Sequence, residues 1–320
     1  MQQTITPETA IATFDLTKRF DKHIAVNDVD LQIKKGDVYG LIGPNGAGKT
    51  TLIRMLAAAE TPTKGEIYLY GDRLLTDNSN PHLKKYLGYL PDDFPLYDDL
   101  TVIDYLEYFA RLYNIPPSER HRRLADVLEL VQLEYKRNAD IATLSRGMKQ
   151  RLSLARTIIH QPVVLLLDEP VSGLDPIARM DFRETIKQLQ QAGMTILISS
   201  HVLSDLAELC TSVGIMELGF LVESTSLAQL YDRLSLQLIL ITILEGEDKL
   251  ISELKNCPTV KAWEKLADGQ RYKLEFTGNQ EDSALLLKNL ITAGVAIADF
   301  HCEKEDLETI FLKLGHKQAS

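Results

Sequence analysis

The sequence predicts an α/β fold with a mostly parallel sheet, and three observations support that prediction. Residues 38–42 form a short apolar strand, and a glycine-rich loop joins them to residues 50–59, which have helical composition. Residues 163–167 are continuously apolar, as expected of a strand buried on both faces. A helical pattern over residues 176–191 and a strand pattern over residues 195–199 follow, and such alternation is typical of parallel sheets.

A group of helices is predicted in the middle of this alternation. Residues 102–109 repeat their apolar positions at helical spacing, and a pair of prolines ends that helix. A second helix is predicted over residues 118–130, and Ser145 has the position of an N-cap at the start of a third. We therefore expect an inserted helical subdomain over about residues 92–161.

The C-terminal part of the chain has a different pattern. Strands are predicted at residues 238–244, 260–266, 270–277 and 295–300, and helices at residues 248–255, 283–292 and 307–314. Asp268 and Gly269, between the two middle strands, are a strong hairpin signal. The order β-α-β-β-α-β suggests a small ferredoxin-like unit. We expect one domain over residues 1–231 and an accessory α+β domain over residues 232–320.

Composition narrows the class of protein. The 320 residues are enough for two domains with real cores, and the net charge of -10 argues against a general nucleic-acid binder. Cys210, Cys257 and Cys302 lie far apart, so neither a zinc site nor a disulfide framework is expected, and a reducing, cytosolic compartment fits best. Residues 1–14 do not resemble a signal peptide, and the longest apolar stretch, residues 236–244, is too short to cross a membrane.

Residues 43–50 fit the phosphate-binding pattern G-x-x-x-x-G-K-[ST] and lie between a strand and a helix, as the pattern requires. Glycines let backbone N–H groups turn toward the phosphates, and the helix directs the positive end of its dipole at them. Lys49 would add a charge between the β- and γ-phosphates, and the Thr50 hydroxyl would ligate Mg²⁺. The flanking elements disfavour the alternative, a glycine-rich turn with a chance lysine. The expected nucleotide-binding residues are Gly43, Pro44, Asn45, Gly46, Ala47, Gly48, Lys49, Thr50 and Thr51.

Two acidic residues, Asp168 and Glu169, directly follow the apolar strand at residues 163–167. Their carboxylates are therefore expected at the carboxyl end of the strand, where ligands bind in open α/β sheets. Asp168 would hold Mg²⁺ through water, and Glu169 would orient or polarise an attacking water. Apolar strands often end in acids, so this pattern is informative only in combination with Lys49.

With three further motifs, these residues resemble one family, the ATP-binding-cassette (ABC) ATPases. Residues 144–151, LSRGMKQR, resemble the family's signature motif, residues 172–175, SGLD, its D-loop, and His201 its switch histidine. The motifs occur in the family's order and spacing over about residues 11–226. The chain is most similar to the ATPase subunits of ABC-2-type exporters, which include bacterial drug-export ATPases.

This resemblance implies a P-loop NTPase fold that also contains an antiparallel β subdomain. It further implies a dimer that sandwiches two ATP molecules, in which Ser145, Arg146 and Gly147 of one chain meet the γ-phosphate bound to residues 43–51 of the other. The physics is consistent, because a capping Ser145 leaves its helix N–H groups facing outward as an anion site. By themselves, residues 144–151 would equally be a capped amphipathic helix.

The resemblance also assigns roles to single residues. Lys49, Glu169 and His201 would be catalytic, with His201 contacting the γ-phosphate and positioning the water, and Asp175 would belong to the D-loop. Phe20 matches the position that stacks on adenine, where Tyr is commoner in the family, and stacking requires only a π face. Without the resemblance, His201 would be interpreted as structural and Phe20 as a core residue.

One position departs from the family in a way that affects the metal site. The family places Gln, and sometimes Glu, after Gly-Tyr-Leu-Pro, and here Asp92 follows that sequence. Asp92 can ligate Mg²⁺ as Thr50 and Asp168 would, but its shorter side chain puts direct coordination and coupling to a partner in question. Arg146 and Met148 also replace the commoner Gly and Gln of the signature, while Ser145 and Gly147 remain.

The function expected from the resemblance is that of an ATP-hydrolysing subunit which binds ATP and Mg²⁺, dimerises on ATP and drives a separately encoded membrane permease, as an exporter. Such a subunit works on the cytoplasmic face of the membrane, and the transported substrate stays open. A ribosome- or DNA-directed ABC protein is the second hypothesis, disfavoured by the single cassette and the acidic charge. A binding-only module is the third, disfavoured by Glu169 and His201.

Overall fold

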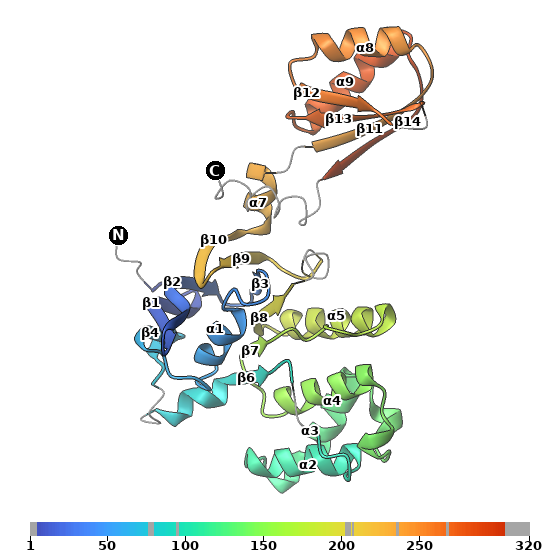
Figure 1. Cartoon of the computed structure of the whole chain (residues 1–320). Coiled ribbons are helices and arrows are strands. Elements are labelled where there is room, and N and C mark those ends of the chain that lie inside the picture. Colours follow the sequence, from blue (N-terminus) through green and yellow to red (C-terminus); the bar gives the residue numbers. More distant parts are fainter. Residues whose placement is uncertain are drawn as a thin grey trace. The chain divides into compact units, whose positions relative to one another are not determined.

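The computed structural model describes residues 5–75, 80–93, 96–201, 206, 208–234, 237–266 and 269–304. The chain divides into two compact units, Met1–Leu227 and Ala228–Ser320 (Figure 1). Each unit has its own sheet system and its own buried core. No described helix combines the length and the apolar character needed to cross a bilayer.

The first unit contains an antiparallel sheet of order β2-β1-β4-β5. Its strands are β1 (Thr9–Phe20), β2 (His23–Lys34), β4 (Lys64–Leu69) and β5 (Asp72–Arg73). Val29, Leu31 and Ile33 alternate with more exposed residues along β2 and are completely buried. The period of two along β2 therefore reflects one face packed into the core.

The second sheet of this unit has six strands in the order β10-β9-β3-β8-β7-β6. Neighbours from β9 to β6 run parallel, and the edge strand β10 pairs antiparallel with β9. Every residue of β3, β7 and β8 is buried, as expected for strands covered on both faces. The strands are β3 (Val38–Ile42), β6 (Leu87–Leu90), β7 (Val164–Leu167), β8 (Thr195–Ser200), β9 (Ser212–Glu217) and β10 (Phe220–Ser226).

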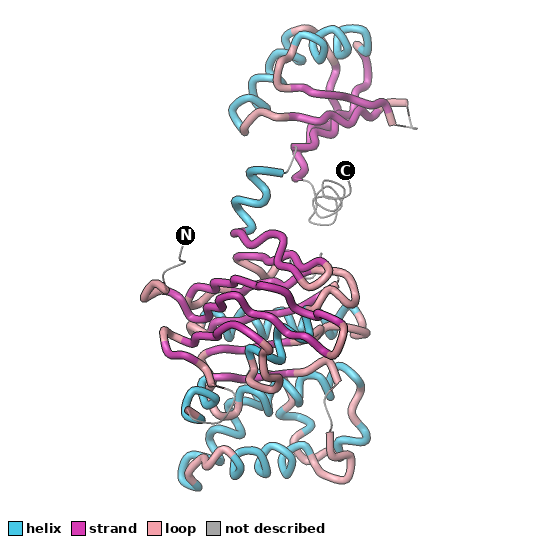
Figure 2. The backbone as a smooth tube through the Cα atoms, turned by 60° about the vertical axis from the view of Figure 1, so that its left-hand side comes forward, coloured by secondary structure: helices cyan, strands magenta, loops and turns pink. Residues whose placement is uncertain are grey.

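Some helices lie beside this sheet, and others form a separate group at one end of the unit (Figures 1 and 2). The helices α1 (Lys49–Leu56) and α5 (Pro176–Gln191) follow β3 and β7 in the chain. The group consists of α2 (Val102–Leu112), α3 (Pro117–Leu130) and α4 (Arg146–Ile158), which pack against one another. Short 3-10 helices lie at η1 (Pro81–Tyr86), η2 (Glu134–Lys136) and η3 (Ile141–Thr143).

The second unit is a four-stranded antiparallel sheet of order β12-β13-β11-β14, with helices α8 and α9 between its strands in the chain. Its core joins Ile239 and Ile241 to Leu274 and to Leu286 of α9. The elements are α7 (Leu227–Leu234), β11 (Gln237–Glu245), α8 (Glu247–Asn256), β12 (Val260–Lys265), β13 (Arg271–Phe276), α9 (Gln280–Thr292) and β14 (Ala296–Lys304).

The predicted α/β class and most predicted elements agree with the structure, and the helix predicted at residues 176–191 has those bounds. The strands that were not predicted are β1, β5, β6 and the two strands of the β9–β10 hairpin. The helix predicted at residues 307–314 and Asp268 of the predicted hairpin turn lie outside the described residues.

Candidate functional site

The parallel sheet places the predicted catalytic motifs at one edge. β3, β8, β7 and β6 are consecutive and parallel, so the segments that follow them leave the sheet at the same side. Gly43 follows β3, His201 follows β8, Asp168 follows β7, and Asp92 lies two residues beyond β6. Strand order, which the sequence pattern does not contain, is what brings these residues together.

The loop between β3 and α1 requires glycine at two positions. A Cβ on Gly43 would lie 2.3 Å from the carbonyl oxygen of Met216, and one on Gly48 would lie 2.2 Å from that of Ala25. Gly48 also has a φ of +105°, which L-residues rarely adopt, and it is the N-cap of α1. The loop therefore directs its backbone N–H groups and the start of α1 toward the same space.

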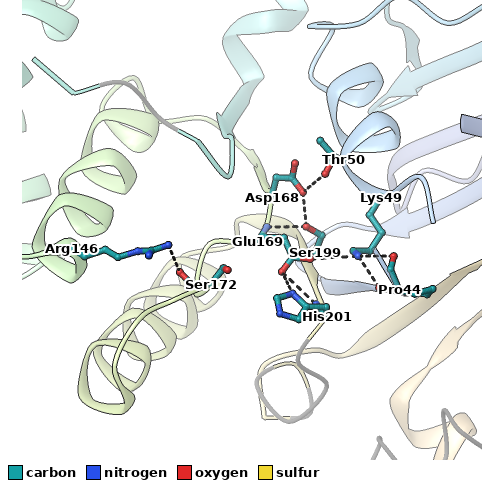
Figure 3. Close-up of polar contacts among 10 residues, drawn as sticks. Pro44, Lys49, Thr50, Arg146, Asp168, Glu169, Ser172, Ser199 and His201 are labelled. Carbon is teal, nitrogen blue, oxygen red and sulfur yellow. Dashed lines mark hydrogen bonds and ion pairs between the residues drawn. The ribbon is translucent and has the colours of Figure 1, made fainter. Parts of the chain in front are cut away.

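Lys49 is buried although it carries a charge, with 6% of its surface exposed. Its Nζ donates to the carbonyl oxygens of Gly43 at 2.7 Å and Pro44 at 3.3 Å. The same nitrogen lies 3.4 Å from Oε1 of Glu169 (Figure 3). These partners hold the ammonium group against the loop, where it can meet an anion in the pocket.

Asp168 is a buried carboxylate with one satisfied oxygen. Its Oδ1 accepts hydrogen bonds from Thr50 Oγ1 at 3.2 Å and from Ser199 Oγ at 2.8 Å (Figure 3). Burial raises the pKa of Asp168, the hydrogen bonds from Ser199 and Thr50 oppose that rise, and the charges of Glu169 and Asp92 add to it. Its Oδ2 is buried and has no hydrogen-bond partner among the described residues.

Glu169 links the buried lysine to the predicted switch histidine. Its Oε2 accepts from Nδ1 of His201 at 2.7 Å, while its Oε1 faces Lys49. The backbone N–H of Glu169 donates to Ser199 Oγ at 2.9 Å, and Glu169 has a φ of +47°. His201 is 46% exposed, so its ring remains accessible. A carboxylate held this way at the end of a strand can accept a proton from water.

A pocket of about 360 Å³ opens over these groups. Phe20 is 43% exposed at its rim, and the Lys18 ammonium lies 4.8 Å from the centroid of the Phe20 ring. His23, which was not predicted as a site residue, also lines the pocket. The lining residues are Phe20, His23, Ala25, Asn45, Gly46, Ala47, Gly48, Lys49, Thr50, Thr51, Asp92 and Glu169.

The predicted signature and D-loop residues do not line this pocket. Ser145 caps α4, and its Oγ accepts from the backbone N–H of Met148 at 3.3 Å. Asp175 caps α5 and accepts from two backbone N–H groups at 3.0 Å. Arg146 contacts the carbonyl oxygen of Ser172, apart from Lys49 (Figure 3). Within one chain, the predicted site therefore divides into two separate groups of residues.

The residues around Asp168 fit a magnesium ion in part. The unpartnered Oδ2 of Asp168 and the nearby Thr50 hydroxyl are oxygen ligands of the kind that Mg²⁺ prefers, and Asp92 lines the same pocket. No group of three or more His, Cys, Asp or Glu side chains within the described ranges could hold a metal ion. An ion here would thus take its remaining ligands from phosphate or water.

Ser199 is a further site residue that sequence reasoning missed. It is fully buried and joins the two acidic residues, because its Oγ donates to Asp168 and accepts from the N–H of Glu169. The sequence contained one signal, a serine at the end of a predicted strand just before His201. That signal could not show that β8 lies beside β7.

Known proteins are similar to this chain in sequence and in fold. The family model described as ABC transporter matches residues 26–172. The bacitracin transport ATP-binding protein BcrA of Bacillus licheniformis is 32% identical over 311 residues, which cover 96% of this chain and 97% of that protein. This chain belongs to the ABC transporter ATP-binding proteins.

Two further similarities agree with membership of the ABC family. The linearmycin resistance ATP-binding protein LnrL of Bacillus subtilis is 29% identical, over 94% of this chain and 96% of its own length. A solved structure titled as the ATP binding subunit of an ABC transporter superposes with a TM-score of 0.63 at 29% identity, covering 70% of this chain and 93% of that one. As an ABC transporter ATPase, this chain binds ATP through its ABC domain.

Proposed function

We propose that this ABC ATPase powers an exporter as a nucleotide-sandwich dimer that acts on a separately encoded membrane permease. Residues 1–231 form the nucleotide-binding domain and residues 232–320 an accessory domain. The dimer works at the cytoplasmic face of the membrane through its permease, and no nucleic acid takes part. The names of two similar proteins, one for bacitracin transport and one for linearmycin resistance, support export as the direction.

In this proposal, one chain supplies the phosphate-binding half of each site. Residues 43–51 surround the phosphates, Lys49 contacts the β- and γ-phosphates, and Phe20 stacks on the adenine. Glu169 accepts the proton of the attacking water. His201 donates to Glu169 and contacts the γ-phosphate, which positions the water between them. Because Lys49 and Glu169 are already 3.4 Å apart, arriving phosphate would compete with the carboxylate for the ammonium group.

The other chain of the proposed dimer supplies the second half of each nucleotide site. Ser145, Arg146 and Gly147 bring the start of α4 to the γ-phosphate, and Asp175 positions the D-loop beside it. Support comes from Ser145, which is exposed at its helix start and does not line the pocket of its own chain. An outward-facing helix N-terminus attracts anions, so it suits a phosphate held by another molecule.

We also propose a role for Mg²⁺ and a class for the accessory domain. Thr50 and Asp168 would hold the ion together with phosphate oxygens, with Asp92 as a further ligand, and bound Mg²⁺ would supply positive charge beside the phosphates. The strand order β12-β13-β11-β14 with all pairs antiparallel supports a ferredoxin-like class for residues 232–320.

The observation that carries the proposed function is the position of Glu169 between Lys49 and His201. Glu169→Gln should reduce phosphate release by about 100-fold or more, the usual contribution of a general base. Because bound ATP then persists, light scattering in MgATP should report twice the 36.0 kDa mass of the single chain. Glu184→Gln, an exposed position on α5, is the matched control and should behave as wild type.

The two readouts of this experiment test separate parts of the proposal. A Glu169→Gln protein that stays monomeric in MgATP would show that the sandwich dimer is wrong for this chain. Unchanged phosphate release would instead remove Glu169 from the catalytic role. Phosphate release at background level from the wild-type chain, under conditions that dimerise it, would favour a binding-only module.

A further inference from the structure

Arg146 makes a contact within its own chain that its proposed role at the γ-phosphate does not require. Its Nη2 donates to the carbonyl oxygen of Ser172 at 3.0 Å. A Cβ built on Gly173 would lie 2.6 Å from the guanidinium carbon and 2.7 Å from Nη2, so the group lies directly against the Gly173 backbone. Gly173 also has a φ of +67°. The guanidinium therefore occupies space that exists only because residue 173 has no side chain.

The contact joins two motifs of the same chain. Residues 145–147, here called the signature turn, begin α4, and residues 172–175, the D-loop, lead into α5. The two helix starts also approach closely elsewhere, since a Cβ on Gly147 would lie 2.9 Å from the Cβ of Ala178. Arg146 thus connects the signature turn to the D-loop by a hydrogen bond, close to where α4 and α5 pack against each other.

We propose that Arg146 is a positioning residue that holds the signature turn on the D-loop, so that both motifs meet the partner chain's ATP as one surface. This inference rests on the proposed sandwich dimer. The planar guanidinium can lie flat on a peptide and donate to its carbonyl at once, whereas the ammonium of lysine is a point charge on a flexible stem. The contact therefore requires arginine, and a positive charge alone is insufficient.

The test measures the MgATP concentration for half-maximal dimerisation in the Glu169→Gln background by light scattering. Arg146→Ala should raise that concentration by about fivefold, the net effect expected for one typical intramolecular hydrogen bond. Arg146→Lys should not restore it. Arg111→Ala removes an exposed arginine with the same charge change, from an i,i+4 ion pair with Glu107, and is the matched control.

A double-mutant cycle separates positioning from direct phosphate contact. Gly173→Ala should displace the guanidinium, so adding Arg146→Ala to it should cause no further loss. The nucleotide-free melting temperature of Arg146→Ala should change by less than about 2 °C, because the side chain is exposed.

Each outcome decides a different question. Additive losses in the cycle, or full rescue by Arg146→Lys, would overturn the positioning role in favour of a charge acting on the phosphate. A Glu169→Gln parent that dimerises equally well with and without Arg146 would overturn the positioning role alone. A parent that stays monomeric would overturn the sandwich dimer and the inference together.

Discussion

Two helix N-termini of this chain have the same physical property, a set of free N–H groups, in opposite surroundings. The start of α1 follows the glycine-rich loop, and Lys49 at this start is 6% exposed with three partners. The start of α4 is exposed at Ser145 and Arg146. The first lines the pocket over the phosphate loop, whereas the second does not.

The difference indicates how the chain distributes ATP binding and ATP hydrolysis. A site with a buried cation can bind phosphate within one chain, because its donors are already oriented. An exposed helix start gains little from an anion in water, since solvent screens the charge, and gains more once a partner excludes that solvent. Changes at α1 should therefore affect ATP binding itself, and changes at α4 should affect only the step that needs the proposed dimer.

The largest effect is expected from Lys49→Ala. Removing the ammonium group deletes the buried positive charge from the pocket lining, so phosphate release should fall by about 1000-fold. ATP affinity should fall as well, and titration of the single chain with ATP would measure it. Lys261→Ala, an exposed lysine on β12, is the control. Unchanged turnover in Lys49→Ala would refute the phosphate role.

A smaller and more selective effect is expected from Ser145→Asp. Aspartate caps helices as well as serine does and favours the helix dipole, so the melting temperature should not fall. Its carboxylate should repel the γ-phosphate of the ATP that the partner chain binds in the proposed dimer. Dimerisation should therefore weaken, and turnover should fall by about 100-fold. ATP affinity of the single chain should be retained. Loss of that affinity would show that the two helix starts are not separate as described.

The sequence alone predicted those features of the fold and the site that depend on residues adjacent in the chain. The phosphate loop, the Ser145 cap and the bounds of α5 follow from local backbone requirements, such as glycine at strained positions and an oxygen side chain before a helix. The same logic placed Asp168 and Glu169 at the end of β7. These features need no knowledge of distant parts of the chain.

Contacts between distant segments were not predictable in this way. Ser199 lies beside Asp168 because β8 pairs with β7, and Arg146 reaches Ser172 because α4 packs on α5. The strands β1, β5, β6, β9 and β10 were missed because short or mixed segments have a weak period. Their pairing is decided by the sheet as a whole.

The smallest effect is expected from Ser199→Ala, which tests how far the first half of the site depends on its supporting hydrogen bonds. The change removes one of two donors to Asp168 Oδ1 and leaves the N–H of Glu169 without its acceptor. A lost hydrogen bond to a buried charged group should lower turnover by about 10-fold, with ATP affinity nearly unchanged, because the loop and Lys49 remain.

Ser153→Ala is the matched control for this last prediction. Ser153 is also fully buried, but its hydroxyl has no hydrogen-bond partner among the described residues, so its removal should be neutral or slightly stabilising. Steady-state phosphate release and ATP titration on both variants separate the effects. If Ser199→Ala weakens ATP binding as much as turnover, the serine supports the whole pocket. If only turnover falls, Ser199 holds the two carboxylates in position for the chemical step.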